Sequence, residues 1–246
     1  MDLDLTPDQE LLRDTTRKFL QTTVPLTAVR ALAENPDGFD RGWWQRGTEL
    51  GWTSLLVEER RGGGSVSEAG LRDLALVAEE IGAMVSPGPL LATNVVAQTL
   101  SREASEELAS HILPGLLSGE SVAAWCVAEP GRDITPDGMT MQARRDGADF
   151  ILDGVKGPVE TGGQADWFLV TATGPEGLSQ FLVPSSAPGL RITPLHGLDL
   201  VRRHAQIGFD GVRVPSSAVV GVLGGAAHSF EEQLQTALVL QCAEMV

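Results

Sequence analysis

The sequence predicts an α+β protein with an N-terminal helical domain, a middle antiparallel β-sandwich or barrel domain, and the start of a C-terminal helical bundle. Helix starts and apolar residues at helical spacing fill residues 1–120. From Ser121 the apolar residues alternate instead, and turn signals recur about every ten to fifteen residues. Helical spacing returns after two glycines and runs to the last residue. We therefore expect domains at residues 1–120, 121–223 and 224–246.

Helix starts are marked most clearly in the first domain. Thr6 is a good N-cap, Pro7 suits the first helical position, and Gln9 can complete a capping box. Asp40 and Ser105 have the side chains that cap two further helices. These signals predict that the first domain is a set of short helices rather than one long one.

The remaining helical segments are separated by breaks. Residues 53–57 predict a short buried extended piece, and Ser67 is expected to open the next helix. Residues 89–100 are apolar on nearly all sides and predict a buried helix. Pro114 and Gly115 should end the last helix of the domain. The glycines at 62–64 predict a tight surface turn, with a phosphate-binding loop as the alternative.

The middle domain is predicted to contain short strands joined by turns. Asp153-Gly154 and Asp210-Gly211 have the composition of hairpin turns. In the helix that follows, Phe230, Leu234 and Leu238 share one face at helical spacing. An apolar stripe that runs to the last residues predicts a partner or further chain that covers it. Strands are expected near residues 139–145, 150–152, 167–171, 181–183, 191–193 and 205–209.

Composition excludes several classes of function. A net charge of -15 argues against a nucleic-acid-binding protein, which would present a basic face. The longest apolar runs are shorter than the ~20 residues of a membrane span, and no secretory signal opens the chain. Cys126, Cys242 and the four histidines show no metal-ligand spacing. We therefore expect no metal and a reduced, cytoplasmic location.

A strand must end at Glu129-Pro130-Gly131, which separates the helical part from the β part. Pro130 cannot donate to a sheet ladder, and Gly131 allows a positive φ. Backbone N–H groups that are left unpaired at such a stop can face a ligand. A plain transition from strand to turn is the alternative.

Three blocks in fixed order resemble the acyl-CoA dehydrogenase family. Residues 125–131 (WCVAEPG) are similar to its flavin strand. Residues 152–156 (LDGVK) and 163–167 (GQADW) resemble its second block, and residues 209–215 (FDGVRVP) its third. Each block alone is a weak signal, but their order along the chain is specific.

The resemblance implies FAD-dependent α,β-dehydrogenation of an acyl-CoA thioester. It also implies a homo- or hetero-oligomer of related subunits and an electron-accepting flavoprotein. The family's catalytic base lies later in the chain, so a base is expected from beyond residue 246 or from another subunit. The alternative is a non-catalytic homologous subunit that pairs with a catalytic one and supports its flavin site. The implied cofactor-binding positions are Trp125, Val127, Ala128, Pro158, Val159 and Glu160.

Several of these positions depart from the family pattern. Ala128 stands where the family has a flavin-bonding Thr, and Pro158 where it has a ring-covering Trp. Glu160 replaces a Thr that contacts the flavin, and its carboxylate would repel the charge on a reduced ring. A solvated turn residue is the alternative for Glu160. Leu238 stands where the family has a substrate-binding Arg.

Three cations have two interpretations each. Lys156 either contacts a phosphate or packs its stem and pairs with an acid. Arg202 and Arg203 either bind phosphates of CoA or adenine, or form ion pairs at the surface.

Overall fold

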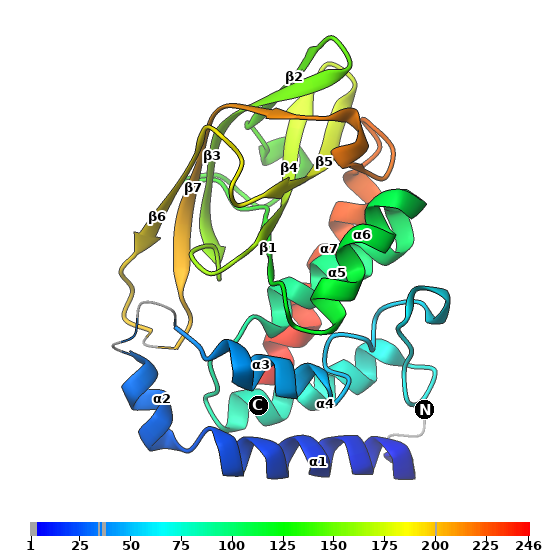
Figure 1. Ribbon diagram of the computed structural model, residues 1–246, viewed down its shortest axis with the longest axis vertical. Coiled ribbons are helices and arrows are strands. Elements are labelled where there is room, and N and C mark those ends of the chain that lie inside the picture. Colours follow the sequence, from blue (N-terminus) through cyan, green and yellow to red (C-terminus); the bar gives the residue numbers. More distant parts are fainter. Residues whose placement is uncertain (1–3, 34, 36–37, 200) are drawn as a thin grey trace.

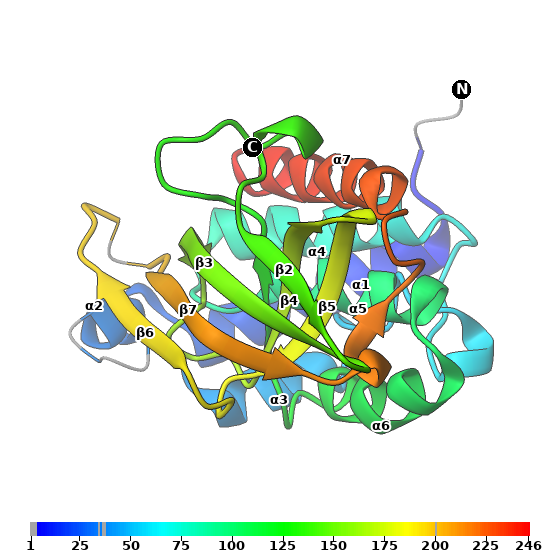
Figure 2. The same cartoon turned by 90° about the horizontal axis from the view of Figure 1, so that it is seen from above.

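The computed structural model describes residues 4–33, 35, 38–199 and 201–246. Among these, six α-helices come first, an eight-stranded sheet follows, and a long helix returns to the first helices. The helices gather at one end of the molecule and the sheet at the other (Figure 1). Seen from the sheet end, the last helix, α7 (Ala227–Glu244), runs along one side (Figure 2). The predicted order of helical part, β part and final helix is confirmed.

Capping residues start the helices where the sequence predicts. Thr6 accepts from the Gln9 backbone N–H at 3.2 Å, and the Gln9 amide oxygen accepts from the Thr6 N–H at 3.1 Å. Asp40 and Ser105 cap two further helices as predicted. The helices before the sheet are α1 (Pro7–Thr23), α2 (Leu26–Ala33), α3 (Arg41–Thr48), α4 (Gly70–Ala83), α5 (Leu90–Glu103) and α6 (Glu106–Leu117).

Three predictions in this helical part are wrong. Residues 53–57 form successive turns rather than an extended piece, although they are largely buried. Ser67 does not cap α4, because its N–H and hydroxyl both donate to the carboxylate of Asp73. Pro114 lies inside α6, which ends at Leu117. Because Pro114 is exposed, water can satisfy the carbonyl that its missing N–H leaves unpaired.

The sheet is mixed and open, with strand order β6-β7-β3-β2-β4-β5-β8 and β1 beside β4. Most neighbours are antiparallel, but β1 and β2 both pair with β4 in parallel. The β domain is thus confirmed, whereas an antiparallel sandwich or closed barrel is not what forms. The strands are β1 (Ala123–Cys126), β2 (Gln142–Asp146), β3 (Asp149–Glu160), β4 (Trp167–Gly174), β5 (Gly177–Pro184), β6 (Leu190–Leu195), β7 (His204–Val214) and β8 (Val219–Val220).

The two predicted Asp-Gly turns are wrong, because both lie inside long paired strands. Gly154 of β3 pairs with Phe209 of β7, and the register shifts between Leu152 and Gly154. The Asp153 carboxylate accepts the N–H of Gly211 at 2.7 Å across the two strands. The irregularity is therefore absorbed as a bulge rather than a hairpin.

Helix α5 lies at the centre of the structure. Every residue from Leu90 to Ser101 is buried, as predicted. It packs against β1, α6 and α7, so it joins the helical part to the sheet. No described helix combines the length and apolar character that crossing a membrane requires.

The predicted apolar stripe of α7 is only partly covered within this chain. Phe230 is fully buried and Leu234 half-buried, but Leu238 is 51% exposed, so its cover by a partner or further chain stays a prediction. The buried face instead includes the polar residues Gln233 and Thr236, each with a hydrogen-bond partner. A search for apolar residues at helical spacing cannot find a face that is held by paired polar groups.

Candidate functional site

The ends of β1 and β3 lie side by side, and both belong to the segments predicted to bind the flavin. The N–H of Gly157 donates to the carbonyl of Ala128 at 2.8 Å. The N–H of Ala128 itself meets no acceptor among the described residues. The structure therefore leaves one half-buried backbone donor at the end of β1, next to the end of β3.

Strand alternation decides which of the predicted side chains face outward. On β3, Pro158 is exposed and Glu160 half-buried, whereas Val159 between them is completely buried in the sheet core. At the end of β1, Val127 is buried against Phe230 of α7. The structure thus gathers the six predicted positions in one region, but Val127 and Val159 offer a ligand only their backbone.

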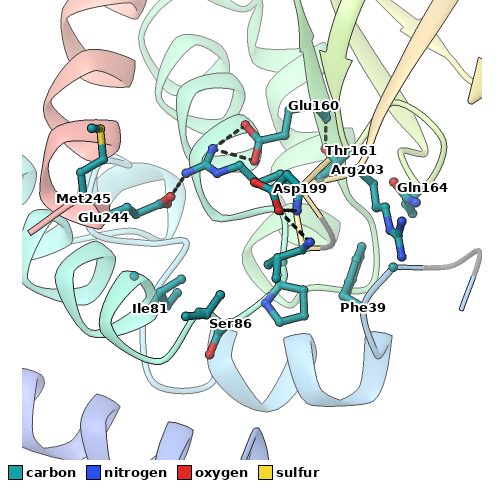
Figure 3. Close-up of a pocket in the computed structure, with 17 residues that line it drawn as sticks. Phe39, Ile81, Ser86, Glu160, Thr161, Gln164, Asp199, Arg203, Glu244 and Met245 are labelled. Carbon is teal, nitrogen blue, oxygen red and sulfur yellow. Dashed lines mark hydrogen bonds and ion pairs between the residues drawn. The ribbon is translucent and has the colours of Figure 1, made fainter. Parts of the chain in front are cut away.

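A cavity of about 200 Å³ lies where the sheet meets the helices. Of the six predicted positions, only Glu160 lines it. The other walls come from the end of α4 and the turn after it, the segment just before α3, the turn after β3, the β6–β7 loop and the end of α7. Figure 3 shows Glu160 and Glu244 on facing sides of this cavity, with Ile81 and Ser86 below them.

Arg202 bridges the two carboxylates across the cavity. It donates to both oxygens of Glu160, at 3.1 and 3.0 Å, and to one oxygen of Glu244 (Figure 3). Its ion-pair interpretation is confirmed, and the pair is partly buried rather than at the open surface. Glu160 is therefore not a solvated turn residue. The partner Glu244 lies far along the chain, with no local pattern that links it to Arg202.

The loop that carries Arg202 is held by Asp199. The carboxylate of Asp199 accepts the N–H groups of Val201 and Arg202 at 2.8 and 3.0 Å. Burial opposes its charge, but these hydrogen bonds outweigh burial and lower the pKa of Asp199. Arg203 next along donates to the carbonyl of Leu32, so its head group also binds within the chain.

A buried ion pair between Lys156 and Glu129 supports the end of β1 from the interior of the protein. Lys156 is completely buried, and its ammonium lies 2.8 Å from Glu129. Glu129 also accepts the N–H and hydroxyl of Thr140 and the N–H of Met141. Burial works against the charge of Glu129, but these partners outweigh it and hold its pKa at about 2. Lys156 is thus a packed, paired lysine, as one of its two interpretations predicts.

The glycine-rich loop forms the predicted tight turn. The N–H groups of Gly62, Gly63 and Gly64 donate to the carbonyls of Glu59, Glu58 and Ser54. A phosphate cradle needs such groups free, so the phosphate-binding alternative is wrong.

No three His, Cys, Asp or Glu side chains of the described residues form a group that could hold a metal ion.

Comparison with known proteins agrees with this fold. The acyl-CoA dehydrogenase N-terminal domain matches residues 6–120, and the acyl-CoA dehydrogenase middle domain matches residues 124–212. The chain therefore belongs to the acyl-CoA dehydrogenase family.

Three relatives illustrate the match. Acyl-CoA dehydrogenase fadE12 of Mycobacterium bovis is 32% identical over 201 residues, covering 76% of this chain and 50% of that protein. A glutaryl-CoA dehydrogenase of Mycobacterium smegmatis, solved in complex with FADH2, is 25% identical with a TM-score of 0.84, over 96% of this chain and 61% of that one. The ChsE4-ChsE5 complex of Mycobacterium tuberculosis is 23% identical with a TM-score of 0.87, over 99% and 64%. The chain spans about half the length of the first of these relatives.

Proposed function

We propose that this chain forms the flavin-holding part of an acyl-CoA dehydrogenase that oxidises the Cα–Cβ bond of an acyl-CoA thioester. The observation that carries the proposal is the unpaired N–H of Ala128 beside the outward face of Pro158 and Glu160. These groups belong to two segments far apart in the sequence, joined by the Gly157–Ala128 hydrogen bond.

The residues present fit a flavin, although they differ from the family pattern. A flavin ring needs a hydrogen-bond donor at its polar edge and an apolar surface against one face. The Ala128 N–H supplies a donor, and the exposed ring of Pro158 supplies apolar surface. When bound, FAD would accept the hydride that leaves the β-carbon of the thioester. Trp125, Val127 and Val159 would shape this surface through packing and backbone.

The charge at Glu160 is compensated within the chain. A lone carboxylate would disfavour the extra negative charge of a reduced ring. Arg202 binds both oxygens of Glu160 and so offsets the charge of this carboxylate. The same guanidinium also bonds to Glu244, so the three side chains together carry one net negative charge at the cavity. Nothing in the described residues is assigned as the base that takes the α-proton. We propose that this group comes from beyond residue 246 or from another subunit.

The partners follow from the same proposal. We infer an acyl-CoA substrate, a homo- or hetero-oligomer of related subunits and an electron-accepting flavoprotein. The division at residues 1–120, 121–223 and 224–246 and the cytoplasmic location remain predictions.

The visible spectrum of the purified full chain tests the proposed function. We expect the chain to take up FAD stoichiometrically and to shift its absorbance bands. Anaerobic addition of an acyl-CoA should bleach these bands once the missing base is supplied by a homologous subunit. A chain that stays colourless and only raises the flavin content of a homologue would instead support the non-catalytic subunit role. If no flavin binds either to the chain alone or in the presence of a homologous subunit, the catalytic and the non-catalytic proposals are both wrong.

A further inference from the structure

Trp125 lies where three apolar clusters of the core meet. Its ring packs against the cluster of the first helices, the cluster around α5 and α6, and a small cluster that contains Val127 and Phe230. Its indole N–H donates to the amide oxygen of Gln233 on α7 at 2.9 Å. The orientation of one ring in β1 is therefore tied to the last helix.

Gln233 belongs to a buried polar network with only one workable arrangement. Its oxygen also accepts from Gln180 at 2.8 Å, and its NH₂ group donates back to the Gln180 oxygen at 2.9 Å. Gln180 donates in turn to Thr171 at 3.1 Å. Turning the Gln233 amide over would set its NH₂ group against two other donors. The acceptor that faces Trp125 is thus fixed by the network.

The spacing of the residues on strand and helix shows what this network controls. Trp125 and Val127 are two positions apart, so they share one face of the extended chain. Phe230 and Gln233 are three positions apart, so they share one face of α7. Val127 packs in the cluster of Phe230 while Trp125 bonds to Gln233. Helix α7 therefore contacts Trp125 of β1 and Val127 just after it, two alternate residues of the segment that leads directly into Ala128.

We propose that Gln233 is a positioning residue: through Trp125 it fixes the end of β1, and with it the backbone donor of Ala128 that a bound ligand would use. This inference rests on the proposed function in naming a flavin as that ligand. The held strand end has its own marker, because the Gly157 N–H is bonded to the Ala128 carbonyl at 2.8 Å. Protection of the Gly157 amide from hydrogen exchange thus reports the strand end without any ligand.

The chain offers a matched control on the same helix. Thr236 lies three positions from Gln233, is 4% exposed, and donates to Gln98 at 3.0 Å. Gln233→Met removes the acceptor of the indole while keeping a similar volume. Thr236→Val removes one buried hydrogen bond from α7 without touching Trp125. Both variants should lower the melting temperature, so melting alone does not separate positioning from general support.

The experiment measures Gly157 amide exchange, FAD affinity and melting temperature in the full chain. We expect Gln233→Met to speed Gly157 exchange and weaken FAD binding, each by about tenfold, because the half-buried indole N–H of Trp125 and the buried amide of Gln180 both lose their acceptor. Thr236→Val should leave both within about twofold of wild type at a similar loss of melting temperature. Trp125→Phe breaks the same bond from the strand side and should also speed Gly157 exchange. It serves as the second variant if Gln233→Met does not fold.

The outcomes separate the two proposals. If Gly157 exchange rises equally in Gln233→Met and Thr236→Val, or in neither, the positioning role is overturned whatever the flavin does. If the wild-type chain binds no FAD while Gly157 still responds only to Gln233→Met and Trp125→Phe, the proposed function fails and the positioning role stands. Faster Gly157 exchange with unchanged FAD affinity overturns the link between the strand end and the ligand.

Discussion

One guanidinium nitrogen of Arg202 donates to both carboxylate oxygens of Glu160, at 3.1 and 3.0 Å. The same guanidinium reaches Glu244 at the end of α7. Three segments that are distant in the sequence thus meet at one cation on the cavity wall. The charge that a ligand would experience there depends on whether this contact is intact.

Removing the cation should make bound flavin harder to reduce. We expect Arg202→Gln to lower the reduction potential of bound FAD on the order of 30 mV, equivalent to about 1.4 kcal/mol for two electrons. Glu160→Gln should raise it by a similar amount. Dye-equilibration of the reduction gives both values. Arg213→Gln is the control. Arg213 of β7 also pairs with two carboxylates, Asp146 and Asp149, but its side chain is exposed. A shift in Arg213→Gln as large as the shift in Arg202→Gln would contradict the proposal that Arg202 and Glu160 act on the bound flavin.

Acid should weaken the fold through Glu129. Its pKa of about 2 in the folded chain lies below its ordinary value of 4.5, so its contribution is present above pH 4.5 and is lost as the pH falls toward 2. We expect this group alone to account for on the order of 3 kcal/mol of the loss in unfolding free energy across that window.

Urea unfolding of Glu129→Gln at several pH values between 2.5 and 7 tests this expectation. The variant should be less stable at pH 7 by about 3–5 kcal/mol, because Lys156 stays buried without its partner. Its stability should also depend less on pH in the acid range. Glu107→Gln, at an exposed position, is the control. A slope in Glu129→Gln as steep as that of wild type would show that other carboxylates govern acid unfolding.

Helices α4 and α7 touch at Gly82, where no side chain fits. A Cβ at this position would lie 2.1 Å from the backbone oxygen of Glu244. We therefore expect Gly82→Ala to displace the end of α7 and cost about 1–3 kcal/mol of stability. Gly163→Ala, where a Cβ meets nothing within 4 Å, should change stability by less than about 0.5 kcal/mol. Denaturant midpoints of the two variants would then differ clearly; similar midpoints would mean that the crossing is loose.

Leu238 gives a gain-of-function test. It is 51% exposed, so Leu238→Arg should change stability by less than about 0.5 kcal/mol. Because the resemblance places a substrate-binding Arg here, we expect the variant to bind acyl-CoA more tightly in a calorimetric titration. Val239→Arg, 41% exposed on the same helix, should not. A gain in both variants would reflect general attraction between added positive charge and the CoA phosphates.

Local signals predicted local structure well. The Thr6 capping box, the caps at Asp40 and Ser105, and the buried helix after Pro89 depend on neighbouring residues, and the structure confirms them. The resemblance similarly placed the β domain after the helices. The sequence points to the ends of β1 and β3 as one site only because the blocks that resemble the family include both segments.

What the sequence could not show depends on contacts between distant segments. Asp153-Gly154 has the composition of a turn, but pairing with β7 along its whole length converts it into a bulge. The buried face of α7 contains Gln233 and Thr236, which look like solvent-facing residues until their partners are known. The contact of Arg202 with Glu244 has no signature in either neighbourhood.

Helix α5 has no side that meets water between Leu90 and Ser101, and it contacts the sheet, α6 and α7 at once. Helix α5 cannot unfold on its own, because exposing it would remove core contacts from the helical part and from the sheet at the same time. The helical and β parts should consequently melt in a single cooperative transition, despite looking like separate bodies in outline.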